Sequence, residues 1–285
     1  MKIKTFIKNA INTILPYRIV KIIKDLRKGR ARIPKASFYF LLNKNRVNKI
    51  INFLSDQESK ETFKKIILWR QEKLPGKKPF HGGEEKQYFI NDFFEYGKKE
   101  VLIDCGAYIG DTIENFLKLP IKYRQIIAFE PSTENFLKLK NNYGKNPRFM
   151  LVHGGVYSKE GMLYFSGLGG HGIVSETPKG VDGEISIKVH SIDGLQLQEK
   201  VTFIKMDIEG TEMDALKGAK ATLLKDKPRL AICIYHSNKD MLRIAEWIHA
   251  LVPEYKLFIR HHGSEDYIHP IMGPAETVLY ATLDM

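Results

Sequence analysis

The sequence lacks several features that mark whole classes of protein. It has no run of about 18 uninterrupted apolar residues, which argues against a membrane-spanning helix. Its start has no compact apolar stretch with a small-residue cleavage site, which argues against a secretory signal. Its two cysteines, Cys105 and Cys233, lie 128 positions apart in apolar runs, so neither a disulfide framework nor a cysteine-based metal site is expected. We therefore expect a chain that stays in the cytoplasm.

Acidic residues are nearly absent from the first part of the chain. Residues 1–50 contain 14 Lys and Arg but one acid, Asp25, and therefore carry a net charge of +13. Because the whole chain carries +12, residues 51–285 carry −1. Such an uneven distribution of charge says little about the fold. It indicates that the basic part contacts an anionic partner, either lipid or nucleic acid.

Residues 1–35 combine this charge with an apolar stripe at helical spacing. The stripe consists of Ile3, Phe6, Ile7, Ala10, Ile11, Ile14 and Leu15. A basic amphipathic helix suits peripheral contact with the inner face of a membrane. The same stripe equally suits packing against the rest of the protein or against a second copy in a homodimer. Nucleic acid is a minor reading, because aromatic residues do not interleave with the basic ones.

The remainder of the sequence divides into two parts. Residues 36–97 read as a helical prelude that ends in a loop marked by Pro75, Pro79, Gly82 and Gly83. Residues 98–285 alternate short apolar runs with helical runs, which predicts an α/β fold with helices on both faces of a mainly parallel sheet. The expected strands are 101–105, 126–130, 149–152, 201–207, 230–235, 255–260 and 277–283, with a hairpin at 162–165 and 185–189. The expected helices are 111–118, 132–142, 211–224 and 240–251.

Ligands of such sheets bind beyond the carboxyl ends of the strands. The first strand ends in Asp104, and Gly106 and Gly110 follow before a helix. The acid would repel a pyrophosphate, and neither Gly-x-Gly-x-x-Gly nor Gly-Lys-Ser/Thr is present, which argues against a dinucleotide or a P-loop. The second strand ends in Glu130, an acid that can accept hydrogen bonds from both hydroxyls of a ribose. Together the two strand ends favour S-adenosylmethionine as the cofactor.

Five segments resemble the FkbM-type S-adenosylmethionine-dependent methyltransferases: VLIDCGAYIGDT, IIAFEPS, FIKMDIEGTEMDALKGA, AICIYHS and ETVLYA. The resemblance covers roughly residues 88–283. It implies a Rossmann-like class I methyltransferase sheet of seven strands with the last one antiparallel, and methyl transfer to a hydroxyl of a sugar or polyketide-like molecule. The cofactor residues that it implies are Asp104, Cys105, Gly106, Ala107, Tyr108, Gly110, Asp111, Thr112, Glu130, Pro131, Ser132, Gly155, Val156 and Asp207. The loop 167–184, with Gly167, Gly169, Gly170, His171 and Gly172, is expected to cover the acceptor.

A sugar hydroxyl is a weak acid, so methyl transfer to it calls for a general base or a metal. The candidate catalytic residues follow the later strands: Asp207, Glu209, His236 and His261. We expect His236 or His261 to be the base, with Glu209 and Glu276 as further candidates. Asp207, Glu209 and His236 could hold Mg²⁺ or Mn²⁺. Alternatively no metal binds, and Glu209 and Glu212 favourably charge the start of the next helix.

Taken together, the sequence predicts an O-methyltransferase that acts on a nucleotide- or lipid-linked sugar of a bacterial surface glycan such as capsule or lipopolysaccharide. Two other functions stay open. Asp207 and Glu209 could form the metal-diphosphate motif of a nucleotide-sugar glycosyltransferase, although the Asp104 turn would then be unexplained. The chain could also be a membrane-attached binding module without catalysis. Base N-methylation is not expected, because Asp-Ile-Glu-Gly stands where an Asn/Asp-Pro-Pro-aromatic motif would be.

Overall fold

The computed structural model describes residues 35–71, 87–90, 92–97, 99–166, 173–180, 184–263 and 275–284. Almost all of the basic segment 1–35 lies outside these residues, and its contact with a membrane or a second copy stays a prediction. The glycines and His171 expected in the acceptor loop, at 167–172, also lie outside them. Within the described part of the chain, no helix is long and apolar enough to cross a membrane.

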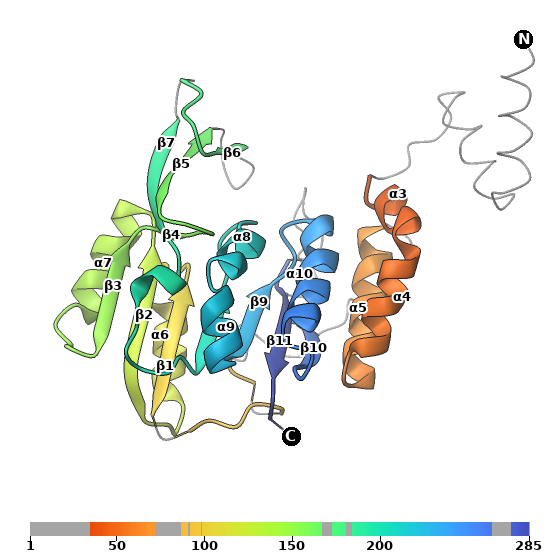
Figure 1. The fold of residues 1–285 in the computed structure, drawn as a ribbon, viewed down its shortest axis with the longest axis horizontal. Helices are drawn as coiled ribbons and strands as arrows, with labels where there is room; N and C mark the ends of the chain where they lie inside the picture. Colours follow the sequence, from red (N-terminus) through yellow and green to blue (C-terminus); the bar gives the residue numbers. More distant parts are fainter. Residues whose placement is uncertain are drawn as a thin grey trace, which may run out of the picture.

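A seven-stranded sheet with the order β10-β11-β9-β8-β1-β2-β3 forms the centre of the molecule (Figure 1). Its strands are β1 (Glu100–Cys105), β2 (Tyr123–Glu130), β3 (Phe149–His153), β8 (Phe203–Met206), β9 (Arg229–Cys233), β10 (Lys256–His261) and β11 (Thr277–Thr282). Strand β11 is antiparallel to both of its neighbours, whereas β3, β2, β1, β8 and β9 pair in parallel. The predicted fold class, with its antiparallel last strand, is confirmed.

Helices cover both faces of this sheet. Side chains alternate between the two faces along each strand, so both faces present apolar side chains that the helices bury. One core contains Ile103 and side chains of α8 (Glu212–Lys217), α9 (Lys220–Asp226) and α10 (Asn238–Leu251). The other contains Leu102 and side chains of α6 (Asp111–Lys118) and α7 (Thr133–Tyr143). The sheet is thus buried on both sides, which explains its nearly continuous apolar strand sequences.

The single helix expected over 211–224 is wrong, because the chain breaks between α8 and α9. A Cβ atom at Gly218 would lie 2.1 Å from the carbonyl oxygen of Tyr157, so the chain there is pressed against another segment. Asp193 then caps the second helix, since its carboxylate accepts the amide hydrogens of Ala221 and Thr222, each at 2.9 Å. Tertiary contacts therefore override a sequence pattern that is continuous on its own.

A second, four-stranded sheet rises above the edge at which the parallel strands end (Figure 1). Its order is β4-β7-β5-β6, with β4 (Gly155–Val156), β5 (Gly161–Ser166), β6 (Ile173–Ser175) and β7 (Ile185–His190). Strands β5 and β7 pair in antiparallel register from Gly161 opposite Val189 to Phe165 opposite Ile185. The expected hairpin between the third and fourth strands is therefore present.

Three helices precede the sheet, α3 (Lys35–Leu42), α4 (Lys44–Phe53) and α5 (Gln57–Arg70), and they lie beside its β10 edge (Figure 1). Ser59 of α5 accepts the amide hydrogen of Ile259 at 2.9 Å, and Asp56 pairs with the buried Arg260 at 2.6 Å. Further along, the Phe93 ring stacks on Phe258 with centroids 4.2 Å apart. The described residues of this helical part are thus packed on the sheet. Whether the chain divides into separate folding units at residue 97 stays a prediction.

Candidate active site

The turn after β1 depends on two glycines in left-handed backbone conformations. Gly106 has φ +82°, and a Cβ atom there would lie 2.0 Å from the carbonyl oxygen of Asp207. Gly110 has φ +99° and begins α6, and its added Cβ would lie 2.3 Å from the ring of Tyr143 in α7. Side chains disfavour this conformation, and there is no room for them. The turn is therefore fixed tightly between the end of β8 and α7.

A buried lysine supports the same turn from inside the sheet. Lys205 Nζ donates to the carbonyl oxygen of Gly106 at 2.7 Å and lies 3.1 Å from Asp104 Oδ1. Burial acts to lower the pKa of Lys205, but the charges of Asp104 and Asp207 outweigh it and the pKa is raised. Asp104 thus faces an internal cation and is wholly buried, and its role with the cofactor stays a prediction.

Glu130, at the end of β2, is joined to the turn through its carboxylate. Its Oε2 accepts the amide hydrogen of Tyr108 at 2.9 Å, and its Oε1 accepts that of Ser132 at 2.8 Å. Burial raises the pKa of Glu130, while these two amides act to lower it. The side chain of Asn135 also hydrogen-bonds to this carboxylate and acts to lower its pKa. A carboxylate has about four acceptor positions, so some capacity remains for a further donor such as a ribose hydroxyl.

The other residues expected to bind the cofactor lie along the same edge of the sheet. Tyr108 has a left-handed backbone at φ +50° and an exposed side chain. Cys105 and Ala107 are buried at the turn, Asp111 and Thr112 begin α6, Pro131 and Ser132 lead into α7, and Gly155 and Val156 form β4. The structure thus gathers these segments at one edge.

Asp207, which directly follows β8, is held by two tyrosine hydroxyls. Tyr88 donates to its Oδ2 at 2.9 Å, and Tyr235 donates to its Oδ1 at 3.1 Å. Burial raises the pKa of both phenols well above the ordinary range, so both remain donors. Neither tyrosine was among the expected site residues. Tyr88 lies 119 positions before Asp207 and no motif connects the two, whereas Tyr235 lies beside His236 in the segment AICIYHS.

His236 lies among three carboxylates, and its side chain is only 3% exposed. Its Nδ1 is 2.9 Å from Glu212 Oε1, and its Nε2 is 3.4 Å from Asp207 Oδ1 and 3.5 Å from Glu209 Oε2. Burial acts to lower the pKa of His236, but Glu212, followed by Asp207 and Glu209, raises it to about 9. The imidazole is therefore protonated near neutral pH in the free chain.

Glu212 lies directly against Nδ1 of this imidazole. Its carboxylate is wholly buried, and the amide of Ile208 donates to Oε1 at 3.0 Å. A carboxylate that holds one nitrogen of a histidine sets the direction of the other nitrogen. From the sequence, Glu212 was expected only to place a favourable charge at the start of a helix. Its proximity to His236 depends on the folded chain and could not be predicted from the local sequence.

Two acids at this edge have strained backbones. Glu209 has φ +56° and a side chain that is 66% exposed, and Glu276 has φ +62°. Left-handed non-glycine residues cost about 1–3 kcal/mol and concentrate at functional sites. Glu276 also accepts a hydrogen bond from Gln87 at 2.5 Å. Both acids were further candidate bases on the sequence alone, which could not foretell this backbone conformation.

His261, the other candidate base, lies within β10 and is buried. Its Nδ1 is 3.0 Å from the hydroxyl of Thr277 in the neighbouring strand. It is thereby engaged within the sheet, whereas His236 faces Asp207. His236 is thus the better placed of the two candidate bases.

The acidic cluster fits a protonated imidazole better than a metal ion. Among the described residues, Asp207, Glu212 and His236 offer ligand atoms within 4.8 Å of one another, so Glu212 takes the place expected for Glu209. However, each nitrogen of His236 already faces a carboxylate, and Asp207 is held by two hydroxyls. A proton on this imidazole competes with metal binding.

The strand order, the glycine turn after β1 and the acid that ends β2 together define a class I methyltransferase fold. Residues 104–264 match the family model of the methyltransferase FkbM domain, which is more than half of the chain. The chain belongs to the FkbM methyltransferase family.

Two relatives illustrate this membership. The chain is 27% identical over 147 residues to the 2-O-methyltransferase NoeI of Sinorhizobium fredii (strain NBRC 101917 / NGR234), a match that covers 45% of this chain and 60% of that protein. It is also similar to the crystal structure of the methyltransferase FkbM from Methylobacillus flagellatus KT, with a TM-score of 0.69 and 25% identity over 86% of this chain. This match also covers 60% of that protein's chain. The chain thus spans about 60% of the length of each relative.

Proposed function

We propose that the chain is an S-adenosylmethionine-dependent O-methyltransferase whose acceptor is a hydroxyl of a sugar. The observation that carries this proposal is the position of His236, held by Glu212 beside Asp207, whose own carbonyl oxygen borders the glycine turn. The FkbM family and the 2-O-methyl chemistry named for one relative support it. The proposed acceptors are nucleotide- or lipid-linked precursors of a surface glycan. We propose that the enzyme meets them in the cytoplasm, at the inner face of the membrane. Family membership favours this function over glycosyl transfer or a binding module.

The chain's own residues fit the cofactor and supply the proton chemistry. S-adenosylmethionine supplies a methyl group already activated by its sulfonium, and Glu130 retains acceptor capacity for a ribose hydroxyl. Neutral His236 keeps its Nδ1 hydrogen on Glu212 and takes the acceptor's hydroxyl proton on Nε2. The new O–CH₃ bond forms as the S–CH₃ bond breaks, which leaves S-adenosylhomocysteine, a methyl ether and imidazolium. Glu212 acts as a positioning residue in this step.

Cofactor binding is tested by calorimetric titration with S-adenosylhomocysteine. We expect micromolar binding that the Glu130→Gln substitution weakens about tenfold or more, because hydrogen bonds to a charged acceptor contribute about 1.5–3 kcal/mol. Glu134→Gln is the matched control, since Glu134 begins the adjacent α7 and pairs with Lys138 on the surface. Repeating the titration with Mn²⁺ tests the metal. Absence of binding under every condition would remove the proposed function, after which nucleotide sugars would be assayed for glycosyl transfer.

The pH dependence of turnover tests the proposed base. Because the pKa of His236 is raised to about 9 in the free chain, the neutral form increases with pH, and kcat/KM is expected to rise toward that pH. Glu212→Gln removes the carboxylate that contributes most to the rise, so the midpoint of the profile should move to lower pH and the maximal rate should fall. The measurement is a pH–rate profile of both proteins in EDTA. A profile that is flat from pH 6 to about 9 in both would exclude His236 as the base.

A further inference from the structure

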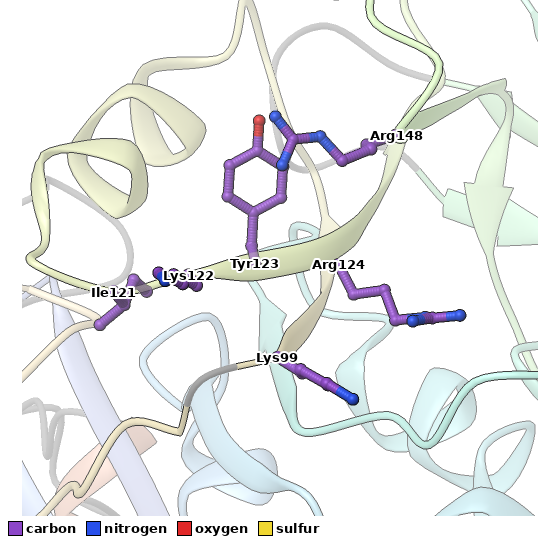
Figure 2. A pocket seen from close by; sticks show the side chains of 6 residues that line it. All are labelled: Lys99, Ile121, Lys122, Tyr123, Arg124 and Arg148. Atoms are coloured by element: carbon purple, nitrogen blue, oxygen red, sulfur yellow. The ribbon is translucent and has the colours of Figure 1, made fainter.

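A basic pocket lies at the edge of the sheet opposite the candidate active site. It has a volume of about 450 Å³ and is lined by Lys99, Ile121, Lys122, Tyr123, Arg124 and Arg148 (Figure 2). These residues precede or begin β1, β2 and β3, whereas the glycine turn follows the far end of β1. A strand of this length spans about 17 Å, so the pocket is separate from the proposed methyl-transfer site.

The pocket carries an excess of positive charge. Four of its six lining residues are cationic and none is acidic. Within the described residues, the acid found in contact with these cations is Glu199, whose Oε1 lies 2.6 Å from Arg124 Nε. Lys99, Lys122 and Arg148 therefore leave about three positive charges around the pocket, although their side chains extend in different directions (Figure 2). An excess of positive charge of this kind attracts anions.

Arg148 is the best oriented of these cations. Its guanidinium carbon lies 4.3 Å from the centre of the Tyr123 ring (Figure 2). Two neighbouring residues hold this ring in place. Asn146 donates to the Tyr123 hydroxyl at 3.3 Å, and Phe149 packs edge-on against the ring. A guanidinium stacked on an aromatic face keeps its N–H edges available, and those edges match two oxygens of a phosphate.

We propose that this pocket binds a phosphate-bearing anion, with Arg148 as its bidentate donor and Lys99, Lys122 and Arg124 as supporting charges. S-adenosylmethionine carries no phosphate, so the pocket does not serve the cofactor. The phosphate belongs either to a soluble ligand or to a lipid headgroup, and both would meet the same side chains. The proposal does not depend on the proposed methyl transfer.

The test uses the full chain and two probes. Inorganic pyrophosphate is titrated by calorimetry at low and at raised NaCl, and phosphatidylcholine vesicles with and without phosphatidylglycerol are sedimented with the protein. We expect Arg148→Ala to weaken binding about fivefold to tenfold, Arg148→Lys to restore only part of it, and salt to weaken it further. The control Lys64→Ala removes the same charge from the exposed side of α5 and should change neither measurement. Arg148 is exposed, so the thermal midpoint of its variants should equal that of the wild type.

Each outcome decides the proposal. Pyrophosphate binding that depends on Arg148, without vesicle binding that depends on it, identifies a soluble ligand. Vesicle binding that requires phosphatidylglycerol and Arg148 identifies a lipid headgroup. If neither probe binds, or if Arg148→Ala and Lys64→Ala have equal effects, the pocket is not an anion site and the proposal is wrong.

Discussion

Replacing His236 with alanine is expected to lower kcat of methyl transfer by about 100-fold or more and to leave the affinity for S-adenosylhomocysteine nearly unchanged. The imidazole lies among Glu212, Asp207 and Glu209, whereas Glu130 is held by the amides of Tyr108 and Ser132. Its loss therefore removes the proton acceptor but leaves Glu130 and the glycine turn, and Asp207 keeps its hydrogen bonds from Tyr88 and Tyr235. Single-turnover rates and calorimetry on the same protein measure the two effects separately.

His261→Ala is the informative comparison for this experiment, because His261 was the other candidate base. It is buried and bonded to Thr277 within the sheet, so its replacement should lower the thermal midpoint and leave kcat of the folded protein within about threefold. His236→Gln adds a second comparison, since an amide can still donate to Glu212 but cannot accept a proton. Full turnover of His236→Ala together with loss of turnover in His261→Ala would transfer the proposed role to His261.

The parts of this site that could be predicted are those determined by chain order. Asp104, Glu130 and Asp207 all follow or end apolar runs, and parallel strands bring such ends to one edge of a sheet. Gly106 and Gly110 were identifiable because few residues other than glycine turn so sharply between a strand and a helix. The family motifs lie on the same segments, so the resemblance and the topology point to the same residues.

The residues that could not be predicted act through partners far away in the sequence. Lys205 reads as an ordinary lysine in a short strand, yet it is buried against Asp104, 101 positions earlier. A charged residue in the middle of a central strand was the available signal, because burial of an unpaired lysine is costly. Tyr88 carried no such signal. The break at Gly218 likewise depends on the position of Tyr157, which only the folded chain determines.

Replacing Gly106 with alanine is expected to be the most damaging change at the cofactor turn. The new methyl group would lie 2.0 Å from the carbonyl oxygen of Asp207, a backbone atom that cannot rotate away, and φ there is +82°. The left-handed conformation alone costs about 1–3 kcal/mol for a residue with a side chain. Separation of the ends of β1 and β8 adds to this, so we expect the free energy of unfolding to fall by about 2–4 kcal/mol.

The same substitution should abolish binding of S-adenosylhomocysteine, because it displaces the turn whose Tyr108 amide donates to the Glu130 carboxylate and whose Gly106 and Ala107 amides donate to the carbonyl oxygen of Phe129. Denaturant unfolding gives the stability, and calorimetry at a temperature where the variant stays folded gives the affinity. Gly161→Ala is the matched control: an added Cβ there meets nothing within 4 Å, so its effect should stay within about 0.5 kcal/mol. Unchanged stability of Gly106→Ala would show that the strand ends can separate freely. Unchanged affinity in a destabilised protein would show that the cofactor does not bind at this turn, and the proposed cofactor site would then be wrong.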